Sequence, residues 1–496
     1  MIDSIIKELT YNSTEPMLFS SGLFLVLFLG FSFVYMLLEH QRTLRLAFVT
    51  LFSYYFYYKS SGYFFLLLAV VTLSDYLLAR AIHKCCSGSS KANGWGCRML
   101  LVMSLLFDLG LLGYFKYANF FAGMWADMVG HNFQPWDIFL PVGISFFTFQ
   151  SMSYTIDVYR GKLQPMPSLL DYAFYVSFFP QLVAGPIVRA SDFAPQIRKP
   201  LAVTPEMFSR GVYFIIIGLF KKAVISDYIS LNFVDRIFDN PSLYSGIENL
   251  LGVYGYAMQI YCDFSGYSDM AIGIALLLGF HFPVNFRSPY SSVSITDFWR
   301  RWHISLSSWI RDYIYISLGG NRKGIFRTYV NLVVTMLLGG LWHGASLNFV
   351  FWGGLHGVAL AVHKWLRGNL FCHARDYSPS GWRRIGSMVL TFHFVCLAWV
   401  FFRNTSFDAS WLMLTKIVTQ FHGELLPQVV AGYPWVFGMI AFGYLTHFIP
   451  ESAERLFQRV ILRGGIVLSA ILLAATIFIV IQTKSSTIQP FIYFQF

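Results

Sequence analysis

Two histidines in this chain lie in surroundings where an imidazole can move a proton. His343 ends the segment Leu337-Leu-Gly-Gly-Leu-Trp-His343, inside a run from Val330 to His356 that contains no charged residue. His303 ends a second segment, Asp297-Phe-Trp-Arg-Arg-Trp-His303, which is rich in aromatic and basic residues. A histidine at membrane depth costs free energy and marks a functional site by default. The pattern predicts proton transfer inside a membrane, with one histidine in the apolar region and one at its edge.

The motifs that the sequence lacks narrow the chemistry. No Gly-x-Ser-x-Gly elbow, Walker loop or His-Glu-x-x-His site is present. Without an obvious covalent nucleophile, a histidine acts most naturally as a general base on a hydroxyl group or on water. We expect His343 to be this base in its neutral form, because burial favours the neutral imidazole. The alternative is a buried histidine that only donates a hydrogen bond to a neighbouring carbonyl group.

A basic segment, residues 285–327, surrounds His303. Guanidinium groups match the geometry of phosphate oxygens, so this segment is a candidate surface for a phosphate-bearing donor. The alternative is an interfacial amphipathic helix that places Trp and Arg at lipid headgroups. The basic residues that we single out as donor contacts are Arg300, Arg301, Arg311, Arg322 and Lys323.

The same segment predicts a helix over residues 294–315, with Ser294 or Thr296 as its N-cap. On a continuous helix, Trp299, His303 and Ser307 follow one another at a spacing of four residues and share a face. Arg300 and Arg311 would then lie on a different side of the helix from His303.

Further polar and aromatic residues are candidates for the lining of a cavity. Asp263 and Asp269 lie among aromatic residues, where an aspartate usually pairs with an arginine or lines a watery path, and we favour a structural ion pair. Trp299 and Trp342 accompany the two histidines. His356 is a third histidine candidate, although a packing role in a contact of small residues is at least as well supported. The segment 180–186 contains two prolines and predicts a helix break that exposes backbone groups.

The composition predicts a polytopic membrane protein. Of its 496 residues, 56% are hydrophobic and 12% are charged, whereas soluble domains carry roughly 25% charged residues. The net charge of +11 would suit a nucleic-acid partner, but cytoplasmic loops rich in Lys and Arg explain it more simply. Because no CxxC pair is present, we expect neither a disulfide framework nor a metal site among Cys85, Cys86, Cys97, Cys262, Cys372 and Cys396.

Apolar runs recur along the whole chain and predict an all-α bundle of roughly eleven to thirteen transmembrane or re-entrant helices, by the usual length of ~20 residues. Several runs are short or contain proline, which indicates broken helices inside the protein. The loops 39–46, 83–98 and 158–170 are basic and the loop 123–137 is acidic, so the positive-inside rule places the amino terminus outside and the basic loops in the cytoplasm. We expect a single integral-membrane domain over residues 1–496.

A set of longer motifs resembles the membrane-bound O-acyltransferase family. The resemblance is greatest to a bacterial branch whose members act in alginate O-acetylation, peptidoglycan O-acetylation and teichoic-acid D-alanylation. The matching segments cover about residues 110–360 in the family's order, and residues 365–496 look like variable closing helices. The segments are Gly113–Asn119, Leu140–Phe146, Ser153–Asp157, Ala184–Ile187, Asp263–Gly273, Asp297–Ser308, Leu318–Arg322 and Met336–Ala345.

The resemblance implies a fold, an activity and partners. The fold is a multi-helix bundle with a central funnel, in which His343 corresponds to the hallmark catalytic histidine and His303 to the second active-site position. The donor is a cytoplasmic acyl thioester, acetyl-CoA in the alginate-type branch, and it is a substrate rather than a tightly bound cofactor. The acyl group passes to periplasmic or extracellular partner proteins that acetylate a polysaccharide. The expected location is the bacterial inner membrane.

Two other functions fit some of these features. One is D-alanyl transfer from a carrier protein to teichoic acid, which the same family resemblance allows. The other is a proton-coupled transporter, because broken helices, buried histidines and Asp263 with Asp269 would serve such a carrier. No inverted repeat is visible in the sequence, which argues against the transporter.

Overall fold

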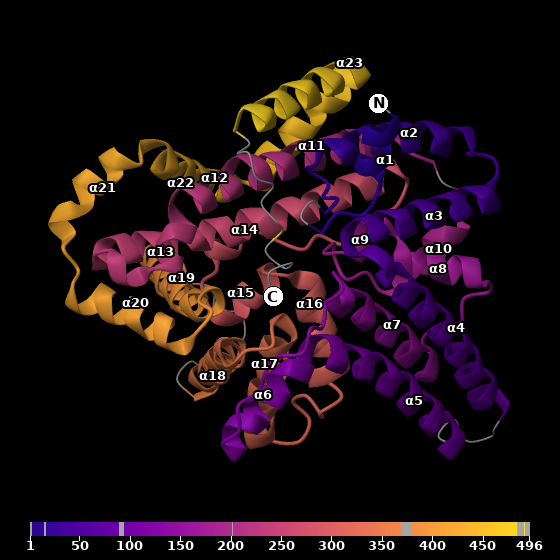
Figure 1. The fold of residues 1–496 in the computed structure, drawn as a ribbon, viewed down its shortest axis with the longest axis horizontal. Helices are drawn as coiled ribbons and strands as arrows, with labels where there is room; N and C mark the ends of the chain where they lie inside the picture. Colours follow the sequence, from indigo (N-terminus) through magenta and orange to yellow (C-terminus); the bar gives the residue numbers. More distant parts are fainter. Residues whose placement is uncertain are drawn as a thin grey trace. The chain divides into compact units, whose positions relative to one another are not determined.

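The computed structural model describes residues 2–13, 16–88, 94–200, 202–369, 379–483 and 491. Every regular element within these residues is a helix, which confirms the predicted all-α class (Figure 1). Cys372 and parts of the closing segment 365–496 lie outside the described residues.

The chain forms two compact units. The first contains residues 1–211 and 270–283, and the second contains residues 212–269 and 284–496. The motif-bearing stretch 110–360 contributes to both units, and the prediction of a single domain stays a prediction.

The first unit is built from helices of very different lengths. Serine caps start two of them: the Ser21 and Ser168 hydroxyl groups accept hydrogen bonds from the backbone N–H groups of Phe24 and Asp171. Its helices are α1 (Ile2–Leu9), α2 (Gly22–Leu37), α3 (Arg42–Ser61), α4 (Phe65–Gly88), α5 (Trp95–Leu112), α6 (Ala118–Val129), α7 (Ile144–Tyr159), α8 (Leu169–Ser177), α9 (Phe179–Leu182) and α10 (Ala190–Arg198).

Two helices contribute residues to both units, α11 (Pro205–Leu219) and α14 (Gly246–Leu277). The second unit contains both histidines of the sequence motifs. Its further helices are the π-helix η3 (Phe220–Ser226), α12 (Asp227–Ile229), α13 (Asp235–Asp239), α15 (Ile295–Arg301), α16 (Ile304–Trp309), the π-helix η7 (Ile310–Tyr315), α17 (Ile325–His343), α18 (Leu347–Asn369), α19 (Gly381–Arg403), α20 (Phe407–Thr419), α21 (Leu426–Gly432), α22 (Pro434–His447) and α23 (Glu451–Thr483).

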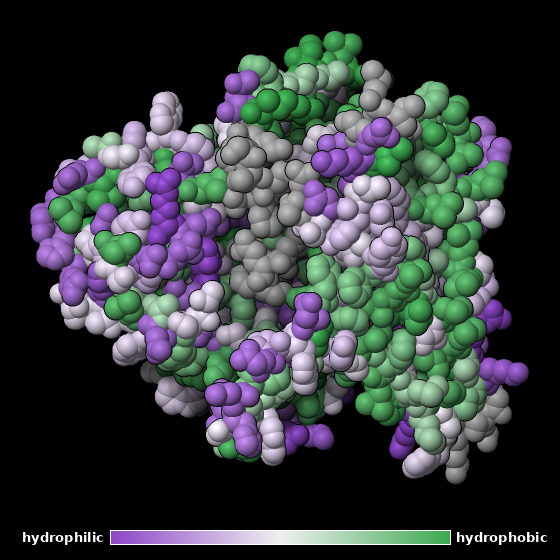
Figure 2. Space-filling view, in the orientation of Figure 1, coloured by the Kyte–Doolittle hydropathy of each residue, from purple (hydrophilic) through white to green (hydrophobic). Residues whose placement is uncertain are grey.

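Five helical stretches of the described residues are long and apolar enough to cross a membrane, or six if a bent pair counts as one span. Their apolar surfaces face outward: in Glu451–Thr483 only 17% of the most apolar window is buried. Figure 2 shows the same property as a largely hydrophobic surface over α3 and α4. Such surfaces suit lipid, and the protein is an integral membrane protein. The five stretches are Arg42–Ser87, Trp95–Val129, Ile325–His343, Gly381–Arg403 and Glu451–Thr483.

Several of the predicted apolar runs form shorter or bent helices, so they are not counted among the five membrane-crossing stretches. The predicted break at residues 180–186 is confirmed, because the four-residue α9 is followed by non-helical backbone through Arg189. At Gly185 a Cβ atom would lie 2.5 Å from the Pro180 carbonyl oxygen, so the chain folds back closely on itself. The segment 423–447 bends by 99° between its two halves.

Candidate active site

His343 occupies the last turn of α17, where that helix packs closely on α18. A Cβ atom on Gly340 would lie 2.2 Å from the Phe349 carbonyl oxygen, and one on Gly353 would lie 2.2 Å from the Met336 carbonyl oxygen. Only glycine permits this approach, as in other close contacts between membrane helices. Gly340 therefore lets the backbone of α18 approach α17 near His343.

Aromatic rings surround the His343 side chain, which is 3% exposed. Its ring centroid lies 5.1 Å from Trp352 and 5.3 Å from Phe402, both in edge-to-face arrangements. The neighbouring Trp342 ring lies 5.0 Å away. These contacts keep water away from the imidazole and hold its orientation by packing.

His303 breaks the helix that the sequence predicted over residues 294–315. The Ser294 N-cap is confirmed, since its hydroxyl oxygen accepts a hydrogen bond from the Asp297 backbone N–H. Helix α15 then ends at Arg301, and His303 adopts a left-handed backbone conformation with φ 43° before α16 begins. The prediction that Trp299, His303 and Ser307 share a helix face is therefore wrong.

Asn285 explains the break, because both its backbone and its side chain bind the chain around His303. Its carbonyl oxygen accepts a hydrogen bond from the Ile304 backbone N–H at 2.9 Å. Its side-chain Oδ1 accepts hydrogen bonds from the Ser305 backbone N–H at 3.1 Å and from the Ser305 hydroxyl at 2.9 Å. These bonds replace helical bonds, and histidine tolerates positive φ better than most residues.

The same Asn285 oxygen lies 3.2 Å from His303 Nδ1. The atom must be the amide oxygen, because it accepts a hydrogen bond from a backbone N–H. The neutral imidazole therefore carries its proton on Nδ1 and presents the lone pair of Nε2. The Asn285 amide nitrogen in turn donates to the Ser268 hydroxyl at 3.2 Å, which fixes the amide's orientation.

His303 is fully buried and neutral. Its side chain is 0% exposed and lies 4.6 Å from the Phe264 ring, centroid to centroid. Burial lowers the pKa of His303 from 6.5 to about 3.

The ring of Trp342 contacts both histidines. Its centroid lies 6.1 Å from the His303 ring and 5.0 Å from the His343 ring. The two imidazoles are therefore no farther apart than the sum of these two distances. The structure brings the two sequence-predicted histidines into one buried cluster, with Trp342 as their common neighbour.

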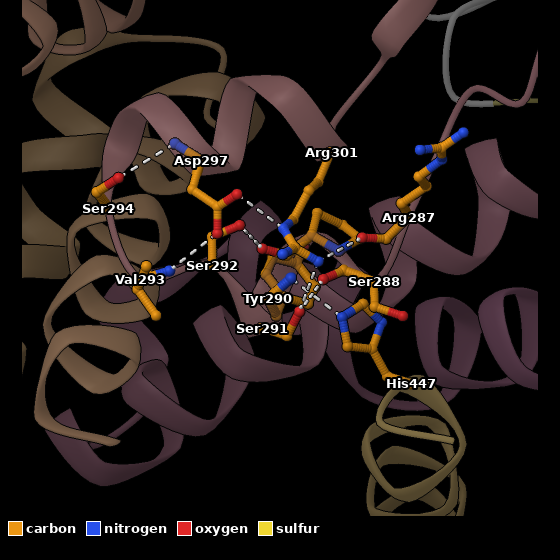
Figure 3. A network of polar contacts seen from close by, with 11 residues as sticks. Arg287, Ser288, Tyr290, Ser291, Ser292, Val293, Ser294, Asp297, Arg301 and His447 are labelled. Carbon is orange, nitrogen blue, oxygen red and sulfur yellow. Dashed lines mark hydrogen bonds and ion pairs between the residues drawn. The ribbon is translucent and has the colours of Figure 1, made fainter. Parts of the chain in front are cut away.

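Arg301 is engaged in a network of polar contacts within the chain (Figure 3). Its Nε lies 3.0 Å from Asp297 Oδ1, and its Nη1 donates to the Ser291 hydroxyl at 3.3 Å. The Arg301 carbonyl oxygen accepts a hydrogen bond from the Arg287 backbone N–H. The guanidinium thus braces the 287–294 loop against α15, and a role as a donor contact stays a prediction.

The other predicted donor contacts have more open surroundings. The Arg311 side chain is 63% exposed and forms an ion pair with the adjacent Asp312 at 2.7 Å. Arg300, Arg322 and Lys323 are exposed. Lys364 of α18, which the sequence analysis did not single out, donates a hydrogen bond to Asn321 at 2.7 Å and adds a cation beside Arg322.

The structural ion pairs expected for Asp263 and Asp269 are present, but their partners are lysines rather than arginines. Lys222 Nζ lies 2.6 Å from Asp263 and 2.8 Å from Asp227, and Lys221 Nζ lies 2.7 Å from Asp269. The sequence analysis missed Lys221 and Lys222, although adjacent lysines inside an apolar run signal buried partners.

His356 packs against aromatic rings, whereas the sequence suggested a contact of small residues. Its Nδ1 accepts a hydrogen bond from Trp299 Nε1 at 3.3 Å, and its ring lies 4.8 Å from Trp352. Trp352 also contacts His343, so His356 and His343 share this tryptophan as a neighbour. Among the described residues no group of three or more His, Cys, Asp or Glu side chains is arranged to hold a metal ion.

Comparison with known proteins gives this cluster its context. Residues 95–407 match the model of the membrane-bound O-acyltransferase family, and both histidines fall inside the match. The chain belongs to the membrane-bound O-acyltransferase family. It is an O-acyltransferase, as the motifs predicted.

Similar proteins from three bacteria illustrate the branch. The probable alginate O-acetylase AlgI of Pseudomonas aeruginosa is 42% identical over 80% of this chain and 74% of its own length. A peptidoglycan O-acetyltransferase of Helicobacter pylori is 38% identical over 69% of this chain and 68% of its own length. A teichoic acid D-alanyltransferase of Bacillus subtilis is 30% identical over 54% of this chain and 69% of its own length.

Proposed function

We propose that this protein transfers an acetyl group from a cytoplasmic thioester, acetyl-CoA, toward hydroxyl groups of an extracytoplasmic polysaccharide, directly or through a partner protein. The observation that carries the proposal is the buried cluster in which Trp342 contacts both His303 and His343. Similarity to proteins named for alginate and peptidoglycan O-acetylation supports the acetyl group and the glycan acceptor. The proposed location is the bacterial inner membrane.

In the proposed reaction, His343 acts as the general base. Its neutral imidazole takes the proton of the acceptor hydroxyl while the hydroxyl oxygen bonds to the thioester carbonyl carbon. The carbon–sulfur bond then breaks, and the departing thiolate takes the proton from the His343 imidazolium. General base catalysis of this kind contributes about 10²–10⁴-fold to the rate.

The tautomer of His303 assigns it a role as a hydrogen-bond acceptor. Because Nδ1–H is directed at Asn285, the neutral ring offers the Nε2 lone pair and has no second N–H to give to an oxyanion. We therefore assign His303 to accepting a hydrogen bond from a second hydroxyl group of the acceptor, which leaves the proton of the reacting hydroxyl to His343. Correct orientation of reacting groups is a large part of enzymatic rate enhancement.

The exposed basic residues Arg300, Arg311, Arg322 and Lys323 are the proposed contacts for the phosphates of the donor. They belong to the same unit as the histidine cluster. An acyl carrier protein would present a phosphopantetheine phosphodiester to the same surface, which is the donor in the D-alanylation alternative.

The test uses the purified protein in sealed proteoliposomes of known orientation. Release of free thiol from acetyl-CoA, with labelled acetate appearing on a soluble oligosaccharide in the opposite compartment, is the expected result. His343→Gln should abolish both signals. Equal thiol release by His343→Gln and the parent would overturn the base assignment, and transport of intact substrate without thiol release would favour a carrier.

A further inference from the structure

A basic pocket lies in the first unit, in a different unit from the histidine cluster. Its volume is about 440 Å³, and its walls are the end of α4 and the turn Gln164–Pro167. Three of its lining side chains, Arg80, His83 and Lys84, come from α4, and none of its described lining residues is acidic.

Two tyrosines hold the walls of this pocket in place. Tyr154 accepts a hydrogen bond from the Met166 backbone N–H at 2.9 Å, and Tyr76 donates to the Pro167 carbonyl oxygen at 3.4 Å. Arg80 Nη1 donates to the Tyr76 hydroxyl at 2.7 Å, so its guanidinium is oriented at the pocket wall. Tyr154 is 0% exposed, and Tyr76 is 7% exposed. The pocket is therefore built from buried supports.

The positive charges of Arg80 and Lys84 on α4 favour the binding of an anion. Arg80 and Lys84 are spaced by four residues and share a helix face, where like charges repel and destabilise the helix. The helix dipole does not explain Arg80, because α4 continues to Gly88 and the dipole acts only within the last turn. A phosphate in the pocket would compensate both charges.

The pocket also marks one end of a membrane-crossing stretch. Helix α4 forms the second half of the apolar stretch Arg42–Ser87, and Arg80 and Lys84 lie near its end. The loops 83–98 and 158–170, which the positive-inside rule assigns to the cytoplasm, both contribute to the pocket. Anionic lipids are concentrated in the cytoplasmic leaflet and bind basic pockets between helices there.

We propose that this pocket binds the phosphate of an anionic phospholipid headgroup at the cytoplasmic membrane surface. Arg80 and Lys84 supply the charge, and the turn Gln164–Pro167 closes the opposite wall. The proposal is independent of the acyl-transfer function, since it concerns a different unit and is measured by lipid binding.

The test is a titration of the delipidated full-length protein with phosphatidylglycerol, phosphatidylcholine or inorganic phosphate, followed by native mass spectrometry. Replacing both Arg80 and Lys84 by Gln should weaken phosphatidylglycerol binding about 30-fold, because each basic residue near an anionic lipid contributes a factor of about five. Lys84→Gln alone, at an exposed position, should weaken it about fivefold. The matched control replaces Arg459 and Arg463, two exposed arginines spaced by four residues on α23, and should bind as the parent does.

Three results would overturn the proposal. One is unchanged phosphatidylglycerol binding in the Arg80/Lys84 double variant. Another is equal binding of phosphatidylcholine, which would show that net headgroup charge is not recognised. The third is binding of inorganic phosphate that displaces the lipid completely, which would assign the pocket to a soluble phosphate compound.

Discussion

His303 and His343 both follow a tryptophan and both are buried, but the chain holds them in different ways. A left-handed backbone and the Asn285 side chain position His303. His343 ends a membrane-crossing helix and is oriented by packing against Trp352 and Phe402. The comparison teaches that a hydrogen bond fixes which nitrogen of His303 carries the proton, whereas helix packing fixes where His343 lies.

The largest expected effect comes from His343. His343→Gln keeps an amide of comparable size in the aromatic cage and removes the base, so acyl transfer should fall by about 10²–10⁴-fold. The check is the rate of thiol release from acetyl-CoA by purified protein, with thermal unfolding as the control for folding. Near-normal turnover in a folded variant would contradict the base assignment.

Substitution of Asn285 should give the next largest loss of activity. It tests the hydrogen bond that positions His303 and leaves the packing of His343 unchanged. Asn285→Leu removes the acceptor for His303 Nδ1–H and should slow transfer about 10–100-fold, as loss of an orienting partner does for metal-bound histidines. Asn285→Asp keeps an oxygen acceptor at this position and should retain much more activity. If both variants lose the same activity, Asn285 acts only in the fold.

The Asn285→Asp variant should also show a changed pH dependence of acyl transfer. The parent His303 is neutral above about pH 3, since burial lowers its pKa to about 3. The free imidazole titrates near 6.5, so the stability from burying the neutral ring is present above that pH and is lost as the pH falls toward 3. A carboxylate at position 285 favours the imidazolium and should raise the pKa of His303, so the acid loss of activity should begin at higher pH.

Substitutions in the contact between α17 and α18 test whether helix packing positions His343. Gly340→Ala places a Cβ atom 2.2 Å from a backbone oxygen of α18, so the helices must separate. We expect a loss of about 1–3 kcal/mol in stability, typical of overpacking, together with reduced transfer. Gly354→Ala is the matched control, because its Cβ would meet a leucine methyl group at an ordinary 3.4 Å. Equal unfolding temperatures for the two variants would show that the close approach is not needed.

The smallest effects distinguish two neighbouring arginines. Arg301→Gln removes a partly exposed brace of the 287–294 loop and should lower stability by about 0.2–1 kcal/mol. Arg300→Gln should leave stability unchanged and raise the KM for acetyl-CoA, because Arg300 is exposed and available to the donor. A raised KM in Arg301→Gln with unchanged stability would reverse these two assignments.

The sequence predicted the parts of the molecule that depend on residue type. The all-α membrane class, the break at residues 180–186 and the Ser294 cap follow from apolar runs, prolines and capping chemistry. His343 was found because an imidazole is rare in a charge-free apolar run, and His303 was found because it lies among aromatic and basic residues.

The parts that sequence reasoning missed depend on contacts between distant residues. Periodicity favoured a continuous helix through His303, since no residue within the motif itself indicates a helix break. The break arises because Asn285, eighteen residues earlier, bonds to the chain at residues 303–305. The adjacent Lys221 and Lys222 carried a local signal, but their pairing with Asp269 and Asp263 on another helix could not be derived from the sequence.

The most direct test of the account measures base-labile acetate on isolated surface polysaccharide. A strain lacking the gene is complemented with the parent, His343→Gln or Asn285→Leu, at equal amounts of membrane-inserted protein. The account predicts full acetate with the parent, none above background with His343→Gln, and an intermediate amount with Asn285→Leu. Full acetate with His343→Gln would contradict the account. An acetate content in the deletion strain equal to that of the parent strain would also contradict it.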